Sequence, residues 1–375
     1  MLTPEGCAAR RQRLWDALPK ACDVLILADP QSLVYFANFY LTPFVFRTCD
    51  ASGILILEPG KATLVTDRMV KAAANQAHVD EVVAPTWYDG KHSAPHRREL
   101  LTDTALNVLR GIRSSRHGIE RSSVPAGLVA DTTATIALDD VVRRLRRVKD
   151  ADELVLMRRS IHAGEAGHAA ALAGLKPGMT ELDAFALIQK AATEAAGDTV
   201  IVYGDFASGP RCEIDRGGPP TDRTIVPGDL FLLDYSVIVR GYRGDFANTF
   251  NVGGAPTSGQ RELFEACVGA IKAGESALKA GVPARSIDEA VRAHFRSLKR
   301  EDAFPSHSGH GIGLSHPEPP YFVCESDETV MVGDVVTIEP GLFVKGVGGM
   351  RFENNYLVTA DGFDTLTHHR ITLEP

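Results

Sequence analysis

Helical and strand-like patterns of apolar and polar residues follow one another along the first part of the chain. A helical pattern over about residues 6–18 precedes the apolar run Val24–Ala28, and two strand-like segments follow, Gly53–Leu57 and Ala62–Thr66. This alternation predicts an α/β unit, and the unit contains no glycine-rich phosphate loop.

A basic stretch marks the end of this unit. Arg143–Lys149 is followed by acidic residues that open a long alanine-rich helix, expected over about residues 154–173. Acidic side chains at a helix start are favoured by the positive end of the helix dipole. We therefore place a boundary near residue 148, which gives an N-terminal domain, 1–147, and a C-terminal domain, 148–375.

The C-terminal domain contains an internal repeat with a spacing of 105 or 106 residues. The segment LKPGMTELDAF, from Leu175, corresponds to GVPARSIDEAV, from Gly281, and each is typical of a loop that leads into a capped helix. In the second copy, Ser286 and Glu289 are expected to form a capping box.

The strands repeat as well. The segment PGDLFLLD ends at Asp234, and VGDVVTIE ends at Glu339, 105 residues later. Two helices followed by a hairpin therefore occur twice. A pseudo-twofold arrangement of the two copies would place Asp234 and Glu339 on either side of one small cavity.

Composition narrows the classes of function. The chain has 375 residues, of which 44% are hydrophobic and 23% charged, as in ordinary globular proteins. A net charge of -8 argues against nucleic acid as a partner. Six cysteines without a CxxC pair suit reduced thiols, and the absence of a signal-peptide core or a long apolar run predicts a cytoplasmic protein with no membrane partner.

Five potential metal ligands lie in short hydrophobic or glycine-rich contexts: Asp234, Asp245, His310, Glu339 and Glu353. Four carboxylates and one imidazole suit two divalent cations. Carboxylates on apolar strands are costly unless a cation neutralises them. Gly309 and Gly311 flank His310, and we expect these glycines to let the backbone approach a metal closely. Together these residues predict a dinuclear metallohydrolase.

Strand parity supports the first pair of acids more directly than the second. Residues that face each other across a two- or four-residue turn have positions with an odd sum, as Asp234 and Asp245 do, so both carboxylates can lie on one face. The positions of Glu339 and Glu353 have an even sum. These two acids therefore require a bulge or a turn with an odd number of residues.

The motifs that contain these residues carry a resemblance to a known family. LLDYS, GDFANTF, SGHGIGL, TIEPGLF and GMRFEN, in this order, resemble the metal-binding motifs of the Xaa-Pro peptidase, methionine aminopeptidase and creatinase superfamily, the pita-bread fold. The resemblance covers about residues 148–370. The N-terminal segment, with DPQSLVYFAN at 29–38, resembles the smaller domain of Xaa-Pro peptidases and creatinase.

The resemblance implies a fold and a mechanism. The fold would be an α/β N-terminal domain followed by an α+β pita-bread catalytic domain with a duplicated helix-helix-hairpin unit, and a homodimer is common in the family. Two divalent ions (Mn, Co, Zn or Fe) would be held by Asp234 on one ion, by His310 and Glu339 on the other, and by Asp245 and Glu353 between them. The ions would share a water of lowered pKa and polarise a carbonyl, with Glu339 as the proton shuttle.

The chain departs from the Xaa-Pro peptidase pattern upstream of the first ligand. There the family has an SGxN segment leading to a PH pair whose histidine contacts the substrate, whereas residues 208–218 contain no histidine. This segment carries Arg211 and Arg216, with Tyr203 just before it, and an arginine fork favours a carboxylate or another planar anion. The alternative is that both arginines pair with acidic residues of their own loop.

Three further residues are candidates for contact with the substrate. His316 follows His310 by six residues, where the family has a histidine seven residues after the ligand, so a small loop shift would bring it to the site. His307 is a candidate for the same contact or for a supporting role. Arg351 matches a family arginine beside the metal centre, where it would contact substrate or a bridging acid.

Three functions follow from these observations. The first is a metal-dependent Xaa-Pro dipeptidase or aminopeptidase acting on short peptides, which the complete ligand set favours. The second is a pita-bread enzyme acting on a small non-peptide compound, by C–N hydrolysis as in ectoine hydrolase or by elimination as in dimethylsulfoniopropionate lyases, which the altered 208–218 segment favours. The third is a non-catalytic binding protein, which the retention of all five ligands disfavours.

Overall fold

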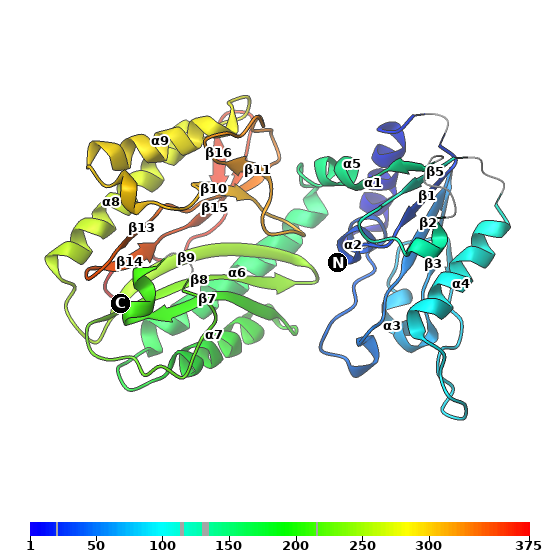
Figure 1. Cartoon of the computed structure of the whole chain (residues 1–375), viewed down its shortest axis with the longest axis horizontal. Helices are drawn as coiled ribbons and strands as arrows, with labels where there is room; N and C mark the ends of the chain where they lie inside the picture. Colours follow the sequence, from blue (N-terminus) through cyan, green and yellow to red (C-terminus); the bar gives the residue numbers. More distant parts are fainter. Residues whose placement is uncertain (20–21, 113–115, 130–134, 215–216) are drawn as a thin grey trace. The chain divides into compact units, whose positions relative to one another are not determined.

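The computed structural model describes residues 1–19, 22–112, 116–129, 135–214 and 217–375. The chain forms two compact units, Met1–Arg146 and Arg147–Pro375. Each unit is shown in Figure 1. Within the described part of the chain, every helix is too short or too polar to cross a membrane.

The first unit is built around a mixed sheet. Its described strands have the order β4-β3-β2-β1-β5-β6, with β2 antiparallel to both of its neighbours and the remaining pairs parallel. Helices lie on both faces of the sheet (Figure 1). The strands are β1 Val24–Leu27, β2 Ile54–Glu58, β3 Lys61–Val65, β4 Glu81–Val83, β5 His117–Ile119 and β6 Thr135–Ala137. The helices are α1 Pro4–Asp16, α2 Pro30–Ala37, α3 Lys71–Ala74, α4 Arg97–Arg110 and α5 Asp139–Leu145.

The predicted elements of the first unit are confirmed. The expected helix is α1, which begins where the Thr3 side chain accepts a hydrogen bond from the Gly6 amide. The three expected apolar strands are β1, β2 and β3, and β1 is buried along its whole length, as expected for a strand covered on both faces. The α/β prediction for this part of the chain is therefore confirmed.

The second unit repeats one arrangement of two helices and a set of antiparallel strands. The first copy comprises α6 Ala151–Gly174, α7 Glu181–Ala196, β7 Ile201–Ser208, β8 Asp229–Val239 and β9 Tyr242–Val252. The second comprises α8 Ser258–Ala277, α9 Ala284–Ser297, β10 Gly309–Gly311, β11 Glu318–Phe322, β12 Val335–Ile338, β13 Gly341–Val344, β14 Gly348–Arg351, β15 Asn354–Val358 and β16 Phe363–Thr365. The strand orders are β7-β8-β9, β11-β10-β12-β15-β16 and β13-β14. This confirms the predicted α+β domain with a duplicated unit.

The starts of the second helix in each copy differ. In the first copy Thr180 and Asp183 form a capping box at the start of α7. In the second copy the expected box of Ser286 and Glu289 is wrong. Helix α9 already begins at Ala284, after Pro283, so Ser286 lies within the first turn and its hydroxyl donates to the Pro283 carbonyl at 2.6 Å.

The strand registers place the acids as parity requires. In the β8–β9 pair, Asp234 faces Ala247 and Ser236 faces Asp245, so the two aspartates lie on the same face, two positions apart. In the second copy, Val344 and Gly348 close a turn of three residues, 345–347. This is the odd turn that Glu339 and Glu353 require, and Gly346 adopts a φ of 78° within it.

Candidate metal centre

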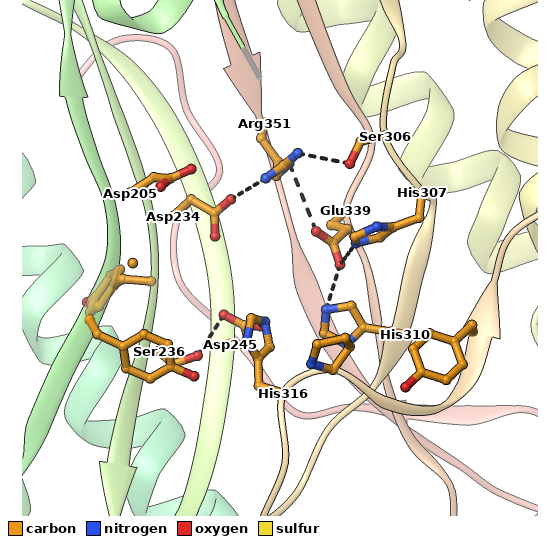
Figure 2. A pocket seen from close by; sticks show the side chains of 15 residues that line it. Asp205, Asp234, Ser236, Asp245, Ser306, His307, His310, His316, Glu339 and Arg351 are labelled. Carbon is orange, nitrogen blue, oxygen red and sulfur yellow. Dashed lines mark hydrogen bonds and ion pairs between the residues drawn. The ribbon is translucent and has the colours of Figure 1, made fainter. Parts of the chain in front are cut away.

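The five predicted ligands converge at one place in the second unit. A cavity of about 430 Å³ is lined by Asp234, Asp245, His310 and Glu339. Glu353 lies next to Asp234 and Asp245, since it offers a carboxylate oxygen within 4.8 Å of oxygens from both. Figure 2 shows the acids of β8 and β9 facing the imidazoles and Glu339 across the cavity. Residues from both copies of the repeat therefore build one site.

The donors form overlapping groups of the size that a metal ion needs. Asp234, Asp245 and Glu353 form an all-carboxylate group, each contributing one oxygen within 4.8 Å of the others. His310 belongs to two further groups of the same spacing, one with His307 and Glu339 and one with Asp245 and His316. Oxygen-rich groups with an imidazole alongside are the donor set that Mn, Fe, Co and Zn accept.

The environment of Glu353 is the strongest indication that the site binds a cation. Its side chain is buried, with 1% exposure, and neither carboxylate oxygen has a hydrogen-bond partner among the described residues. Burial, and then the charges of Asp245, Glu339 and Asp234, raise its pKa well above 4.5. A buried carboxylate without donors is destabilising, and a bound cation is the usual way to neutralise it. The residues present therefore fit a divalent metal.

Asp234 also has a raised pKa, and an arginine opposes the rise. Burial raises the pKa of Asp234 to about 7, and Asp245 and Glu339 add to this rise while Arg351 opposes it. Arg351 Nη1 donates to Asp234 Oδ2 at 2.7 Å. Arg351 thus stabilises the charged form of Asp234, one of the five predicted ligands (Figure 2).

The imidazoles stabilise the charged forms of two other acids. Burial alone would raise the pKa of Glu339, but His310 and His307 outweigh it and leave the pKa lowered. Their Nε2 atoms lie 3.2 Å and 3.3 Å from Glu339 Oε1. His316 Nε2 lies 2.6 Å from Asp245 Oδ2, and this carboxylate raises the pKa of His316 to about 9.

A backbone contact orients the imidazole of His310, the predicted histidine ligand. His310 Nδ1 lies 3.0 Å from the Gly311 carbonyl oxygen, which leaves Nε2 directed toward Glu339. The flanking glycines allow close strand packing, and the expected close approach of the backbone to a metal stays a prediction. A Cβ on Gly309 would lie 2.1 Å from the Thr337 oxygen, and one on Gly311 would lie 2.1 Å from the Pro319 oxygen.

The predicted substrate-contact residues divide into two sets. His307, His316, Arg351 and Tyr203 all line the cavity. Arg211 does not: its Nη1 donates to the buried Glu181 at the start of α7, and its Nη2 donates to the Gly217 carbonyl. Arg216 lies outside the described residues.

Glu181 explains why Arg211 is held away from the cavity. This carboxylate also accepts hydrogen bonds from the amides and hydroxyls of Ser208 and Thr221. Arg211 therefore stabilises the segment around η5, the 3-10 helix Gly209–Glu213, through contacts inside the protein. For Arg211, the alternative of a structural ion pair is confirmed in kind, but the partner, Glu181, lies on α7, 30 residues earlier, rather than in the loop.

Several residues of the site were not predicted. Arg243 Nη1 donates to the Tyr203 hydroxyl at 2.7 Å, and its Nη2 donates to the Leu314 carbonyl at 2.7 Å, so it fixes one wall of the cavity. Asp205 and Tyr321 also line the cavity. Asp205 faces Asp234 across the β7–β8 pair, a proximity that the alternation of β7 alone does not reveal.

Known proteins resemble the chain in both units. The model of metallopeptidase family M24 matches residues 155–360, and that of the creatinase/prolidase N-terminal domain matches residues 10–161. The protein named uncharacterized peptidase YqhT, from Bacillus subtilis (strain 168), is 26% identical over 341 residues, covering 88% of this chain and 90% of its own.

Two solved structures share the fold over nearly the whole chain. The Xaa-Pro dipeptidase from Bacillus anthracis superposes with a TM-score of 0.83 at 24% identity, covering 98% of this chain and 99% of its own. The prolidase from Pyrococcus horikoshii OT3 gives 0.82 at 24% identity, covering 97% and 99%.

Proposed function

Because the chain belongs to metallopeptidase family M24, a family of metal-dependent hydrolases, we propose that it hydrolyses Xaa-Pro peptides with two divalent metal ions. The observation that carries the proposal is the set of five donors around one cavity, with Glu353 buried among them without a hydrogen-bond partner in the described residues. The structural similarity to a Xaa-Pro dipeptidase and a prolidase supports the choice of peptide.

Each donor has a place in this proposal. Asp234, Asp245, His310, Glu339 and Glu353 would hold the two ions. The chemistry that the metal supplies when bound is activation of water and polarisation of the scissile carbonyl. Mn, Co, Zn or Fe suits these donors.

The remaining residues of the cavity move protons and orient the substrate. Glu339 accepts the proton of the attacking water and passes it to the leaving nitrogen, and His307 beside Oε1 stabilises its charged form until then. His316 and His307 offer N–H donors to the peptide. Arg351 holds Asp234 in place through the 2.7 Å contact. The homodimer and the cytoplasmic location remain predictions.

One observation favours a second candidate. Residues 208–218 contain no histidine, and Arg211 of this segment is engaged by Glu181. A segment that supplies no imidazole, and whose described arginine, Arg211, is bound to Glu181, suits a small non-peptide substrate with a C–N bond, hydrolysed by the same site.

Release of proline distinguishes the two candidates. We expect the full chain, reconstituted separately with Mn²⁺, Co²⁺, Zn²⁺ and Fe²⁺, to release proline from dipeptides with proline in second position, and not from the same peptides after chelation. The matched control peptides have alanine in place of proline. Bound metal without proline release from any peptide of the panel would leave the small-molecule candidate as the function.

A further inference from the structure

A sixth carboxylate, outside the five donors, lies on the wall of the cavity. Asp205 is on β7 and faces Asp234 of β8 directly in the strand register. Figure 2 shows the two side chains next to each other on the same wall. Gly204 makes this close pairing possible, because a Cβ there would lie 2.2 Å from the Asp234 carbonyl oxygen.

Within the described chain, this carboxylate has little to neutralise it. The Gly218 amide donates to Oδ1 at 2.9 Å, and Asp205 forms no ion pair with any described residue. Its charge contributes to the raised pKa of Asp234. Like charges directly opposite on paired strands are destabilising, so the arrangement has a cost that a bound cationic group would remove.

Neither the described cationic side chains around the cavity nor the groups of possible metal donors neutralise the charge of Asp205. Arg351 is engaged by Asp234, His316 by Asp245, and Arg243 by Tyr203 and the Leu314 carbonyl. Among the described residues, Asp205 belongs to none of the groups whose donor atoms are close enough to hold a metal together. A positive charge that neutralised Asp205 would therefore have to come from a molecule that enters the cavity.

We propose that Asp205 recognises an ammonium group of the substrate and thereby selects peptides that carry a positive charge at their N-terminal residue. This inference rests on the proposed peptidase function. An ammonium group donates charge-assisted hydrogen bonds to a carboxylate, and Asp205 is only partly buried, so both partners can meet without full desolvation. The ammonium belongs either to the free N-terminus or to a lysine side chain at the first position.

Steady-state kinetics of Asp205→Asn tests the inference. The substrates are Ala-Pro, its N-acetyl form and Lys-Pro, and the control is Asp222→Asn, which removes an exposed carboxylate outside the cavity. Loss of a charge-assisted hydrogen bond should raise the KM of the variant about tenfold or more, with kcat changed much less.

Comparison of the three substrates identifies which ammonium group Asp205 binds. If the ammonium is the N-terminus, KM rises for both Ala-Pro and Lys-Pro in Asp205→Asn, and N-acetyl-Ala-Pro is a poor substrate of every variant. If it is the lysine side chain, the wild type prefers Lys-Pro and only this KM rises. Equal KM values for Asp205→Asn and Asp222→Asn on both free dipeptides overturn the inference.

Two measurements exclude indirect effects. Bound metal should be the same in both variants, and a loss of metal in Asp205→Asn would overturn the inference by assigning the residue to the metal centre. Thermal unfolding should show that Asp205→Asn is folded, and Asp205→Ala serves as a second charge-removing variant if it is not.

Failure of the proposed function gives a different result. If the metal-loaded wild type hydrolyses none of the peptides, the peptidase proposal fails, and binding of alaninamide to the full chain then tests Asp205 alone. Weakening of this binding by about tenfold in Asp205→Asn supports ammonium recognition. Equal affinity in both variants contradicts it.

Discussion

Replacement of Glu353 by glutamine separates the cost of burying a carboxylate from its value as a ligand. Glu353 is 1% exposed, its oxygens have no hydrogen-bond partner among the described residues, and burial raises its pKa well above 4.5. Glutamine has a similar shape and no charge, and its amide can donate to a neighbouring carboxylate such as Asp245. We therefore expect the metal-free variant to be more stable than the metal-free wild type at pH 8.

The size of the effect follows from the missing partner. A buried polar group without a hydrogen bond costs about 1–3 kcal/mol. For a domain of the size of Arg147–Pro375, about 1 kcal/mol shifts the unfolding midpoint by roughly 2–4 °C. Metal-free Glu353→Gln should therefore unfold roughly 2–12 °C above the metal-free wild type.

The difference in stability between the variant and the wild type should depend on pH, and its direction follows from the raised pKa of Glu353. A carboxyl whose pKa is higher in the folded than in the unfolded state binds more protons when folded, so its contribution to stability falls as the pH rises from the unfolded toward the folded value. The pKa of Glu353 is raised in this way from 4.5. The advantage of the variant should therefore grow as the pH rises above about 4.5.

Calorimetry of chelator-treated samples, repeated with added Mn²⁺ or Co²⁺, measures both the stability of the metal-free protein and its stabilisation by metal. Metal should stabilise the wild type far more than Glu353→Gln and so reverse their order, because the variant lacks one ligand. Glu325→Gln, at an exposed position, is the matched control. A metal-free variant less stable than the wild type at pH 8, or equal stabilisation of both by metal, would refute the reasoning.

Three further variants test other parts of the site. Arg211→Met should lower the free energy of unfolding by about 1–3 kcal/mol in urea, because Glu181 loses a donor, and should leave KM unchanged; a raised KM with normal stability would place Arg211 at the substrate. His316 has a pKa raised from 6.5 to about 9 by Asp245, so its stabilisation of the metal-free protein is complete below about pH 6.5 and is lost as the pH rises through about 9. The difference in unfolding free energy between wild type and His316→Asn should therefore shrink over that interval, and a constant difference would argue against the pair. Asp245→Ala should lose most of kcat together with bound metal, since its carboxylate belongs to two donor groups; full metal content in the variant would contradict its place between the ions.

Local pattern was enough to predict several elements of both units and the two acids, Asp234 and Glu339, that follow apolar runs. Apolar runs that finish in Asp234 and Glu339 gave the repeat, and the turn with an odd number of residues needed for Glu353 is present at 345–347. These features depend on neighbours within one hairpin or on a similarity along the chain. Both are visible in the sequence.

Contacts between distant segments could not be predicted in this way. Arg211 had two chemically reasonable partners, an anion in the cavity or an acid of its own loop, and the structure pairs it with Glu181 on α7 instead. Asp205 becomes part of the cavity only because the β7–β8 register sets it opposite Asp234. A strand pattern determines which face a residue occupies, but the residue that faces it depends on how strands pair.

The metal content of the full chain tests the central claim most directly. After reconstitution with Mn²⁺ or Co²⁺ and removal of free ions, we expect elemental analysis to find about two divalent ions per chain, and fewer in Glu353→Gln but not in Glu325→Gln. A wild-type chain that binds no ion under these conditions would contradict the account.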